Sequence, residues 1–361
     1  MDGCCGPEIG AGRGGRRSFL RLGRRGPSPA CTALVAATST GTARGEIRTA
    51  YPALLEDIVL ERVPGTDVYY TVGHYAVPDQ RNEGHTSNAG FVVTSGGVVV
   101  FDALGTPSLG WALLQKIRLV TDQPVRYVVL SHYHADHIYG LQAFRDHTDA
   151  VVLAQDSARR YTDPANNDEL AAPRLEQRRT ALAPWVNKAT RIVEPSRTFD
   201  REAGFELGGQ RFRIVYAGPA HSSSDAMMLV EPAGILFAGD IVQAGRIPFM
   251  ASAAVDTKNW LRGLEEVGAM RPRFVLPGHG PLSSGPAAAI AFTRGYIDHV
   301  RAAMAQAVAD WVEFDAAYQQ TDWSAYQAMP AFASSNRGNA YRVYLEMQAA
   351  SLQPDEAPTR R

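Results

Sequence analysis

Short apolar stretches bounded by turn-forming residues recur along the chain after about residue 55. Stretches of this length, whether alternating or continuous, predict half-buried or buried strands. Ser95-Gly96-Gly97 separates two of them and predicts a hairpin turn. Strands are expected within 58–73 and at 91–93, 98–101, 125–130, 150–154, 211–216, 226–230, 235–238 and 274–276.

Between and after these strands the apolar residues change to helical spacing. Those from Trp111 to Ile117 fall on one face of a helix predicted over 107–121. Further helices are expected over 167–184, over 258–270 and, with interruptions near Thr321 and Pro330, from Pro286 to about Leu352. Strand-rich, mixed, strand-rich and helical segments in this order fit two mixed sheets between helix layers.

The bulk composition indicates a globular protein with no broad basic surface. Of the 361 residues 45% are hydrophobic, and the formal net charge is −1 at pH 7, so nucleic acid is not expected as a partner. No run of about 18 apolar residues is present, so no membrane-spanning helix is expected. The three cysteines, at positions 4, 5 and 31, precede the predicted strands. A metal in the folded body must therefore be held by nitrogen and oxygen.

Residues 1–45 differ from the rest of the chain in being rich in arginine and glycine. Arg16-Arg17-Ser18-Phe19-Leu20-Arg21 resembles a twin-arginine export signal. It predicts a disordered leader and a periplasmic or secreted protein. Two arginines and two prolines interrupt the apolar segment that should follow. The alternative is therefore a basic leader without export and a cytoplasmic protein.

The chemistry is concentrated in Ser131-His132-Tyr133-His134-Ala135-Asp136-His137, which comes directly after the strand predicted at 125–130. Alternation along an extended chain points His132 and His134 the same way, and Asp136 and His137 fall on the following turn, before a short helix. A loop at the end of a strand can aim several side chains into one cavity. Neutral imidazole is a good ligand for zinc and its neighbours. The segment therefore predicts a metal site.

This segment resembles the HxHxDH signature of the metallo-β-lactamase superfamily. Three further segments, each after a predicted strand, resemble the family's other motifs and occur in the family's order: Gly218-Pro219-Ala220-His221, Phe237-Ala238-Gly239-Asp240 and Pro277-Gly278-His279-Gly280. The resemblance covers roughly residues 60–285. It implies an α/β fold, a four-layer αββα sandwich of two mixed β-sheets, as a catalytic domain over 55–285. A C-terminal helical extension over 286–355 would follow.

The resemblance also implies a two-metal site. His132, His134 and His221 would hold the first ion, Asp136, His137 and His279 the second, and Asp240 would bridge them. Asp102, at the end of a predicted strand, would orient a ligand by hydrogen bonding. Two zinc ions per chain are expected, and iron and manganese are also compatible with these donors.

Two divalent ions and two aspartates leave such a site net positive. A hydroxide that bridges the ions could then form near neutral pH and attack a polarised substrate, with Asp136 as the catalytic residue that orients it and accepts its proton. No Gly-x-Ser-x-Gly elbow is present. The expected function is hydrolysis of a carbonyl ester, thioester, lactone or lactam in a small-molecule substrate.

Asp240 narrows the choice among the branches of the superfamily. True β-lactamases of this fold have a cysteine at this position or lack the bridging carboxylate. The chain is similar to bacterial zinc metallohydrolases associated with sulfur-oxidation and quinoprotein pathways. An iron-dependent persulfide dioxygenase is one alternative, since that branch uses a similar set of residues. A metal-binding accessory protein of a periplasmic oxidation pathway is another, although the intact ligand set disfavours it.

The substrate pocket is less well defined by the sequence. Residues 74–88 read as a loop that could overhang the metals. Candidates to contact substrate are His74, Tyr75, His85, Tyr139 and Arg246, the last for an anionic group. For each of them an ordinary solvated, packed or surface role is the alternative. The C-terminal helices could cover one edge of the site or form an oligomer contact.

Overall fold

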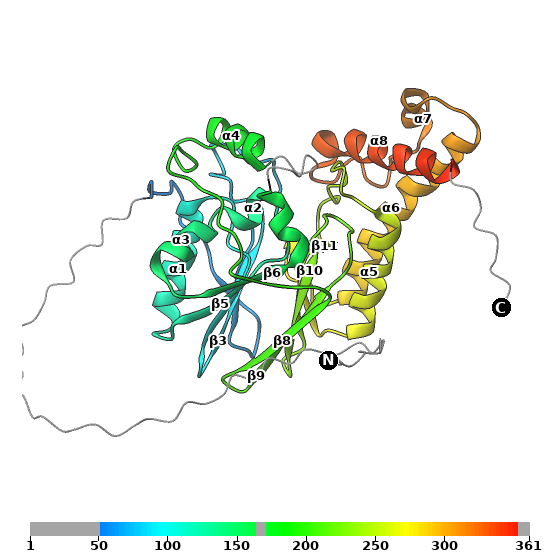
Figure 1. Ribbon diagram of the computed structural model, residues 1–361. Coiled ribbons are helices and arrows are strands. Elements are labelled where there is room, and N and C mark those ends of the chain that lie inside the picture. Colours follow the sequence, from blue (N-terminus) through cyan, green and yellow to red (C-terminus); the bar gives the residue numbers. More distant parts are fainter. Residues whose placement is uncertain (1–50, 164–170, 353–361) are drawn as a thin grey trace, which may run out of the picture.

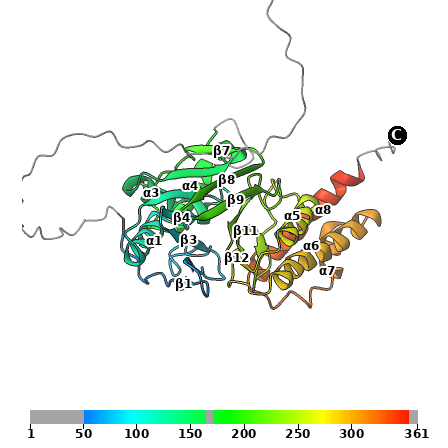
Figure 2. The ribbon, with the colours of Figure 1, turned by 90° about the horizontal axis from the view of Figure 1, so that it is seen from below.

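The computed structural model describes residues 51–163 and 171–352 (Figure 1). The predicted leader over 1–45 lies outside the described residues, as do the last residues of the predicted helical extension, so export stays a prediction. Two sheets lie face to face in the middle of the molecule, with helices on both sides (Figures 1 and 2).

The first sheet has seven strands whose spatial order follows the sequence. They are β1 (Glu61–Arg62), β2 (Val68–Thr71), β3 (Ala89–Thr94), β4 (Gly97–Phe101), β5 (Val125–Val129), β6 (Val151–Gln155) and β7 (Arg197–Phe199). β1 to β4 pair antiparallel, whereas β4 to β7 pair parallel. Because β4 and β5 are parallel, the chain leaves both at the same edge, with Asp102 after one and Ser131 after the other.

The second sheet has five strands in the order β12-β11-β10-β9-β8. They are β8 (Glu202–Leu207), β9 (Gln210–Tyr216), β10 (Ala226–Glu231), β11 (Ile235–Gln243) and β12 (Phe274–His279). Only β11 and β12 pair parallel among these described strands. Their C-terminal halves therefore lie together, which places Asp240 near His279.

Helices form the two outer layers. Beside the first sheet are α1 (Pro107–Val120), α2 (Ala135–Ile138), α3 (Leu141–His147), a 3-10 helix η1 (Asp156–Tyr161) and α4 (Ala171–Ala181). Beside the second are α5 (Thr257–Met270), α6 (Pro286–Ala309), α7 (Phe314–Gln320) and α8 (Phe332–Ser351). In Figure 1, α4 and α8 lie above the same edge of the sandwich, on opposite sides of it.

Three apolar cores hold these layers together. Val98 and Val100 of β4 pack against α1 and α3, whereas Val99 and Phe101 point to the other face and pack against the second sheet. This alternation explains why β4 is apolar throughout, since both of its faces are buried. A third core joins the second sheet to α5, α6 and α8, so the C-terminal helices share a core with the sandwich. The four-layer αββα fold predicted from the sequence is confirmed.

Some element boundaries differ from the prediction. The short strands β7 and β8 were not predicted, because both have exposed polar positions. β11 and β12 extend beyond the predicted 235–238 and 274–276, so Asp240 and His279 lie inside strands rather than after them. The apolar run stops at Ala238, but burial continues to Gln243. Within residues 51–163 and 171–352, no helix is long and apolar enough to cross a membrane.

Candidate metal centre

Seven histidine and aspartate side chains meet at one edge of the sandwich, where several strands of both sheets end. They come from the loop after β5, from α2, from the loop between β9 and β10, and from the ends of β11 and β12: His132, His134, Asp136, His137, His221, Asp240 and His279. Five of them are buried, whereas His134 and Asp136 are partly exposed.

The seven side chains form two groups of three with Asp240 between them. In each group one potential ligand atom per residue lies within 4.8 Å of the others: His132, His134 and His221 in one, Asp136, His137 and His279 in the other. A third set of the same kind combines Asp240 with one histidine from each group, His132 and His137. Asp240 Oδ1 lies 3.3 Å from His137 Nε2, and its Oδ2 lies 3.2 Å from Nε2 of His221 and of His279.

The donor atoms at the centre fit a pair of divalent cations. His132 Nε2, His137 Nε2 and Asp240 Oδ1 are buried and have no hydrogen-bond partner. Leaving such an atom unpaired costs about 1–3 kcal/mol, and a cation between the groups would remove this cost. Imidazole nitrogen with carboxylate oxygen is a donor set that suits zinc and also iron and manganese.

Hydrogen bonds on the far side of the rings orient three of the histidines. Nδ1 of His279 donates to the Thr86 carbonyl at 2.6 Å, and Nδ1 of His221 donates to the Phe249 carbonyl at 3.0 Å. Nδ1 of His137 donates to a carboxylate oxygen at 2.8 Å. Because Nδ1 carries the proton, the lone pair of Nε2 faces the centre in each ring.

The carboxylate bound to His137 belongs to Asp102, which also acts on the other group. Asp102 accepts hydrogen bonds of 2.7 Å from both the backbone N–H and the hydroxyl of Ser131. The Ser131 hydroxyl in turn accepts from His132 Nδ1 at 2.9 Å. One buried carboxylate thus orients a histidine of each group, and its own backbone is held at a φ of 60°. Ser131 was not predicted as a site residue, and its place just before the motif was the only indication.

Electrostatics keep three of the imidazoles neutral. Burial is the largest cause that lowers the pKa of His132, His134 and His221, and other histidines nearby lower it further. For His137, burial acts in the same direction, but Asp102 and two further carboxylates outweigh it and raise its pKa. A neutral imidazole is the form that binds a metal. The carboxylates around His137 mark a place where positive charge is favourable.

The two aspartates at the centre are ionised. Burial opposes this, but the charges of nearby histidines, His137 among them for both carboxyls, outweigh burial and hold the pKa of Asp136 and that of Asp240 well below their usual range. The approach of Asp240 depends on a glycine, since a Cβ added at Gly278 would overlap Oδ1 of Asp240. The Pro277-Gly278-His279 segment therefore brings one side chain into the centre and leaves room for another.

A cavity of about 300 Å³ opens above this centre. Five of the seven metal-centre residues line it, all except His132 and His137, and we call the seven together its floor. Its wall consists of Tyr75–Pro78, Phe249, the start of α8 near Ser334, and three arginines, Arg174, Arg178 and Arg246. Arg174 and Arg178, on α4, were not predicted, because that segment reads from its sequence only as a charged helix.

The structure brings only part of the predicted substrate-contact residues to this cavity. Tyr75 and Arg246 line it. His74 is exposed outside it, and His85 is buried edge-on against His74, with their ring centroids 6.0 Å apart. Tyr139 is fully buried in the core under α1 and α3. None of these last three lines the cavity.

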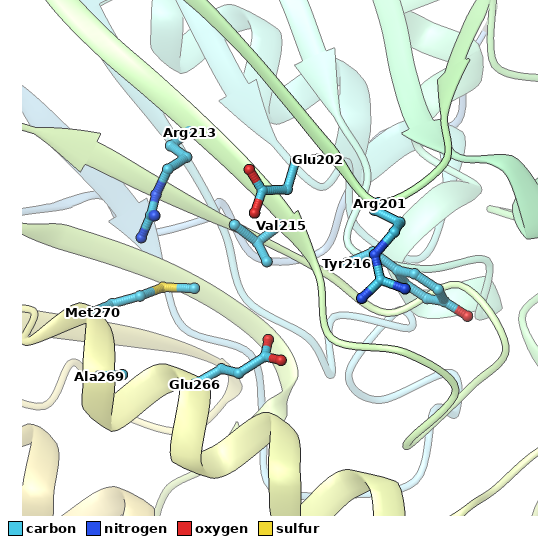
Figure 3. Close-up of a pocket in the computed structure, with 8 residues that line it drawn as sticks. All are labelled: Arg201, Glu202, Arg213, Val215, Tyr216, Glu266, Ala269 and Met270. Carbon is cyan, nitrogen blue, oxygen red and sulfur yellow. The ribbon is translucent and has the colours of Figure 1, made fainter. Parts of the chain in front are cut away.

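A second cavity, of about 270 Å³, lies between β8 and β9 on one side and the end of α5 on the other. Glu202 and Glu266 lie between Arg213 and Arg201 along it (Figure 3). None of its lining residues belongs to the metal-centre groups. Since charges of both signs are mixed there, the cavity favours neither an anion nor a cation.

Comparison with known proteins decides the family. The sequence model described as "Metallo-beta-lactamase superfamily" matches residues 83–279, which is more than half of the chain and includes all seven floor residues. The chain belongs to the metallo-β-lactamase superfamily. Members of this superfamily are mostly metal-dependent hydrolases, and the histidine and aspartate groups fit divalent metal ions.

The chain spans only part of the length of two curated relatives that it matches. A linear primary-alkylsulfatase of a Pseudomonas species is 19% identical over 216 residues, which are 52% of this chain and 40% of that protein. A metallo-beta-lactamase fold-containing protein of Sulfurisphaera tokodaii is 26% identical over 163 residues, 44% of this chain and 61% of that protein.

Solved structures show the same fold. A metallo-beta-lactamase from Pontibacter korlensis matches with a TM-score of 0.51 and 21% identity, over 67% of this chain and 99% of that one. A double mutant of the sec-alkyl sulfatase PisA1 matches with a TM-score of 0.60 and 15% identity, over 83% of this chain and 52% of that one.

Proposed function

We propose that the protein is a hydrolase that uses two divalent metal ions, zinc in the first instance, to cleave an ester-type bond in a small organic molecule. The observation that carries this proposal is the position of Asp240 between two groups of three ligands whose inward-facing nitrogens include unpaired ones. The cavity above supplies room for a substrate.

Each group would hold one ion, with the Asp240 carboxylate shared between them. When bound, the two ions would lower the pKa of a water molecule toward neutrality and polarise the substrate oxygen. The histidines are oriented for this by the Asp102, Thr86 and Phe249 contacts, so that little rearrangement is needed on binding.

Asp136 is the floor carboxylate best placed to handle a proton. It lines the cavity, its side chain is 19% exposed, and its lowered pKa keeps it ionised. Its Oδ2 also lies 3.4 Å from the Thr86 hydroxyl, which restrains its orientation. It would orient the attacking water and accept its proton. The proposed substrates are carbonyl esters, thioesters, lactones and lactams.

Sulfate esters are a second candidate substrate class. Two of the similar proteins are named as alkyl sulfatases, although this chain matches only 40% and 52% of their lengths. A sulfate ester, like a carbonyl ester, presents an oxygen that the ions could polarise.

The full chain should be purified and its metals measured by elemental analysis, beside a panel of thioester, lactone, nitrocefin and alkyl sulfate substrates. We expect about two zinc ions per chain, fewer in His221→Ala and His279→Ala, and hydrolysis of at least one substrate class. His147→Ala, on α3 and away from the cavity, is the matched control. Iron alone, with oxygen consumed in the presence of a persulfide and no hydrolysis, would replace the proposal with the dioxygenase. Bound metal without any turnover would favour the accessory protein.

A further inference from the structure

Three arginines from two distant parts of the chain line one cavity. Arg174 and Arg178 lie one turn apart on α4 and so share a face of that helix. Arg246 follows β11 in the second sheet. The structure therefore brings helix and sheet together to place three guanidinium groups around the space above the metal centre.

These arginines are not used to stabilise the fold through ion pairs. Among the described residues, none of the three forms a salt bridge, and Nε of both Arg178 and Arg246 is buried without a hydrogen-bond partner. Their neighbour Arg179 shows the contrast: it binds Glu176 Oε2 at 3.1 Å and donates to two backbone carbonyls. One face of α4 is thus fixed by protein partners, and the other is left open to the cavity.

Arg246 is the most informative of the three. It is only 9% exposed, and among the described residues its side chain has one close polar contact, from a guanidinium nitrogen to His279 Nδ1 at 3.3 Å. That nitrogen already donates its proton to the Thr86 carbonyl, so it offers Arg246 no acceptor. Asp240 and Asp136 are near enough to favour its charge, but neither forms an ion pair with it. A buried guanidinium without a paired carboxylate is costly, and a bound anion would offset the cost.

The remaining charges and surfaces of the cavity indicate the kind of anion. Among the described residues that line it, the carboxylates are Asp136 and Asp240, which face the histidines of the floor and would be occupied by metal. Val77, Pro78 and Phe249 add an apolar stretch to the wall. Guanidinium groups bind the oxygens of carboxylate, sulfate and phosphate in a fork. An organic anion could bind the arginines through its charged group and the apolar stretch through its hydrocarbon part.

We propose that Arg174, Arg178 and Arg246 form an oxyanion-binding site that selects organic substrates with a carboxylate, sulfate or phosphate group beside an apolar part. The inference rests on the proposed function in assigning the occupant as the substrate. The site itself depends only on the cavity and its arginines.

The test is calorimetric binding to the full chain loaded with zinc, which requires no turnover. The probes are hexanesulfonate, hexanoate and hexylphosphonate, none of which has an ester bond, and uncharged hexanamide. We expect the anions to bind at least about tenfold more tightly than hexanamide, because one hydrogen bond between charged groups contributes about that much to the affinity. The order among the anions tells which oxyanion the site fits.

Substitutions then separate the contribution of the arginines to anion affinity from that of the metals, which also attract anions. Arg246→Gln and the double variant Arg174→Gln with Arg178→Gln should each weaken anion binding about tenfold or more, with hexanamide unchanged. Arg246→Lys should restore part of the affinity, and Arg145→Gln, which removes an exposed arginine of α3, should change nothing. Thermal melting shows that each variant is folded.

Two outcomes would overturn the site. Anion affinity that is the same in wild type and in both glutamine variants means that the metals alone bind the anion. Equal affinity for hexanamide and the anions means that the cavity does not select charge. Arginine-dependent binding without hydrolysis of any panel substrate would instead sink the proposed function and leave the site standing.

Discussion

The floor and the wall of the cavity are held in place by different means. On the floor, His137, His221 and His279 each donate to a fixed partner behind the ring, and Asp102 joins the two groups through Ser131. On the wall, Arg178 and Arg246 have unpaired buried nitrogens, and Tyr75 is 41% exposed. The difference indicates that the floor is built for fixed metal geometry, whereas the wall is open to adapt to a ligand.

Removing the proton acceptor from the floor should have the largest effect. We expect Asp136→Asn to lower kcat by about 100-fold or more, the range of general-base catalysis. The measurement is kcat on the best panel substrate, with metal content determined in parallel. Full turnover at full metal content would exclude Asp136 as the catalytic base, whereas lost metal would assign it mainly to binding.

The next largest effect is expected from weakening the hydrogen bonds that orient the histidines of the floor. Asp102→Asn leaves His137 Nδ1 and the Ser131 hydroxyl without their charged acceptor. We expect metal affinity to fall about 10- to 100-fold, as for other groups that orient metal ligands. Competition with a chromogenic chelator measures it. If both ions are retained with wild-type affinity, the floor does not depend on this carboxylate.

Adding one methyl group at a close approach tests the packing of the floor. Gly278→Ala would push against Asp240, so we expect a loss of about 1–3 kcal/mol in the free energy of unfolding together with weaker metal binding. Gly268→Ala is the control: it lies in α5 with nothing within 4 Å of the added carbon. There alanine should stabilise by up to about 1 kcal/mol. Urea unfolding measures both, and equal effects would contradict the close approach.

The loop that carries part of the wall should contribute to stability in a way that depends on pH. Burial, with a further contribution from His74, lowers the pKa of His85 to about 4. The folded state thus favours the neutral ring. The resulting stability is present above the unfolded pKa of about 6.5 and is lost as pH falls toward 4.

We therefore expect His85→Gln to remove up to about 3 kcal/mol of the difference in stability between pH 7 and pH 4. Urea unfolding of both proteins at the two pH values measures it, and titrations shared by both, including those of the metal ligands, cancel in the difference. Parallel pH profiles would show that His85 is not held neutral by the fold.

Much of the fold could be predicted from the sequence because several of the strands are buried on both faces. β4 and β5 appear as unbroken or nearly unbroken apolar runs, and α5 as a helical pattern of the right length. β7 and β8 have exposed polar positions, so local pattern could not distinguish them from loops. Asp240 and His279 were expected just after strands and lie within them, because the parallel pairing of β11 and β12 continues past the apolar residues.

The sequence by itself determined which side chains are available for metal chemistry, because each lies in a short motif tied to the end of a strand. Parallel strands bring such ends to a common edge wherever the sheet forms. Only the tertiary structure decided that Ser131 couples His132 to Asp102, and that Arg174 and Arg178 of α4 face the same cavity as Arg246. Asp102 and Ser131 are 29 residues apart in the chain, and Arg174 and Arg246 are 72 residues apart, so their placement depends on how whole layers pack, which no local pattern encodes.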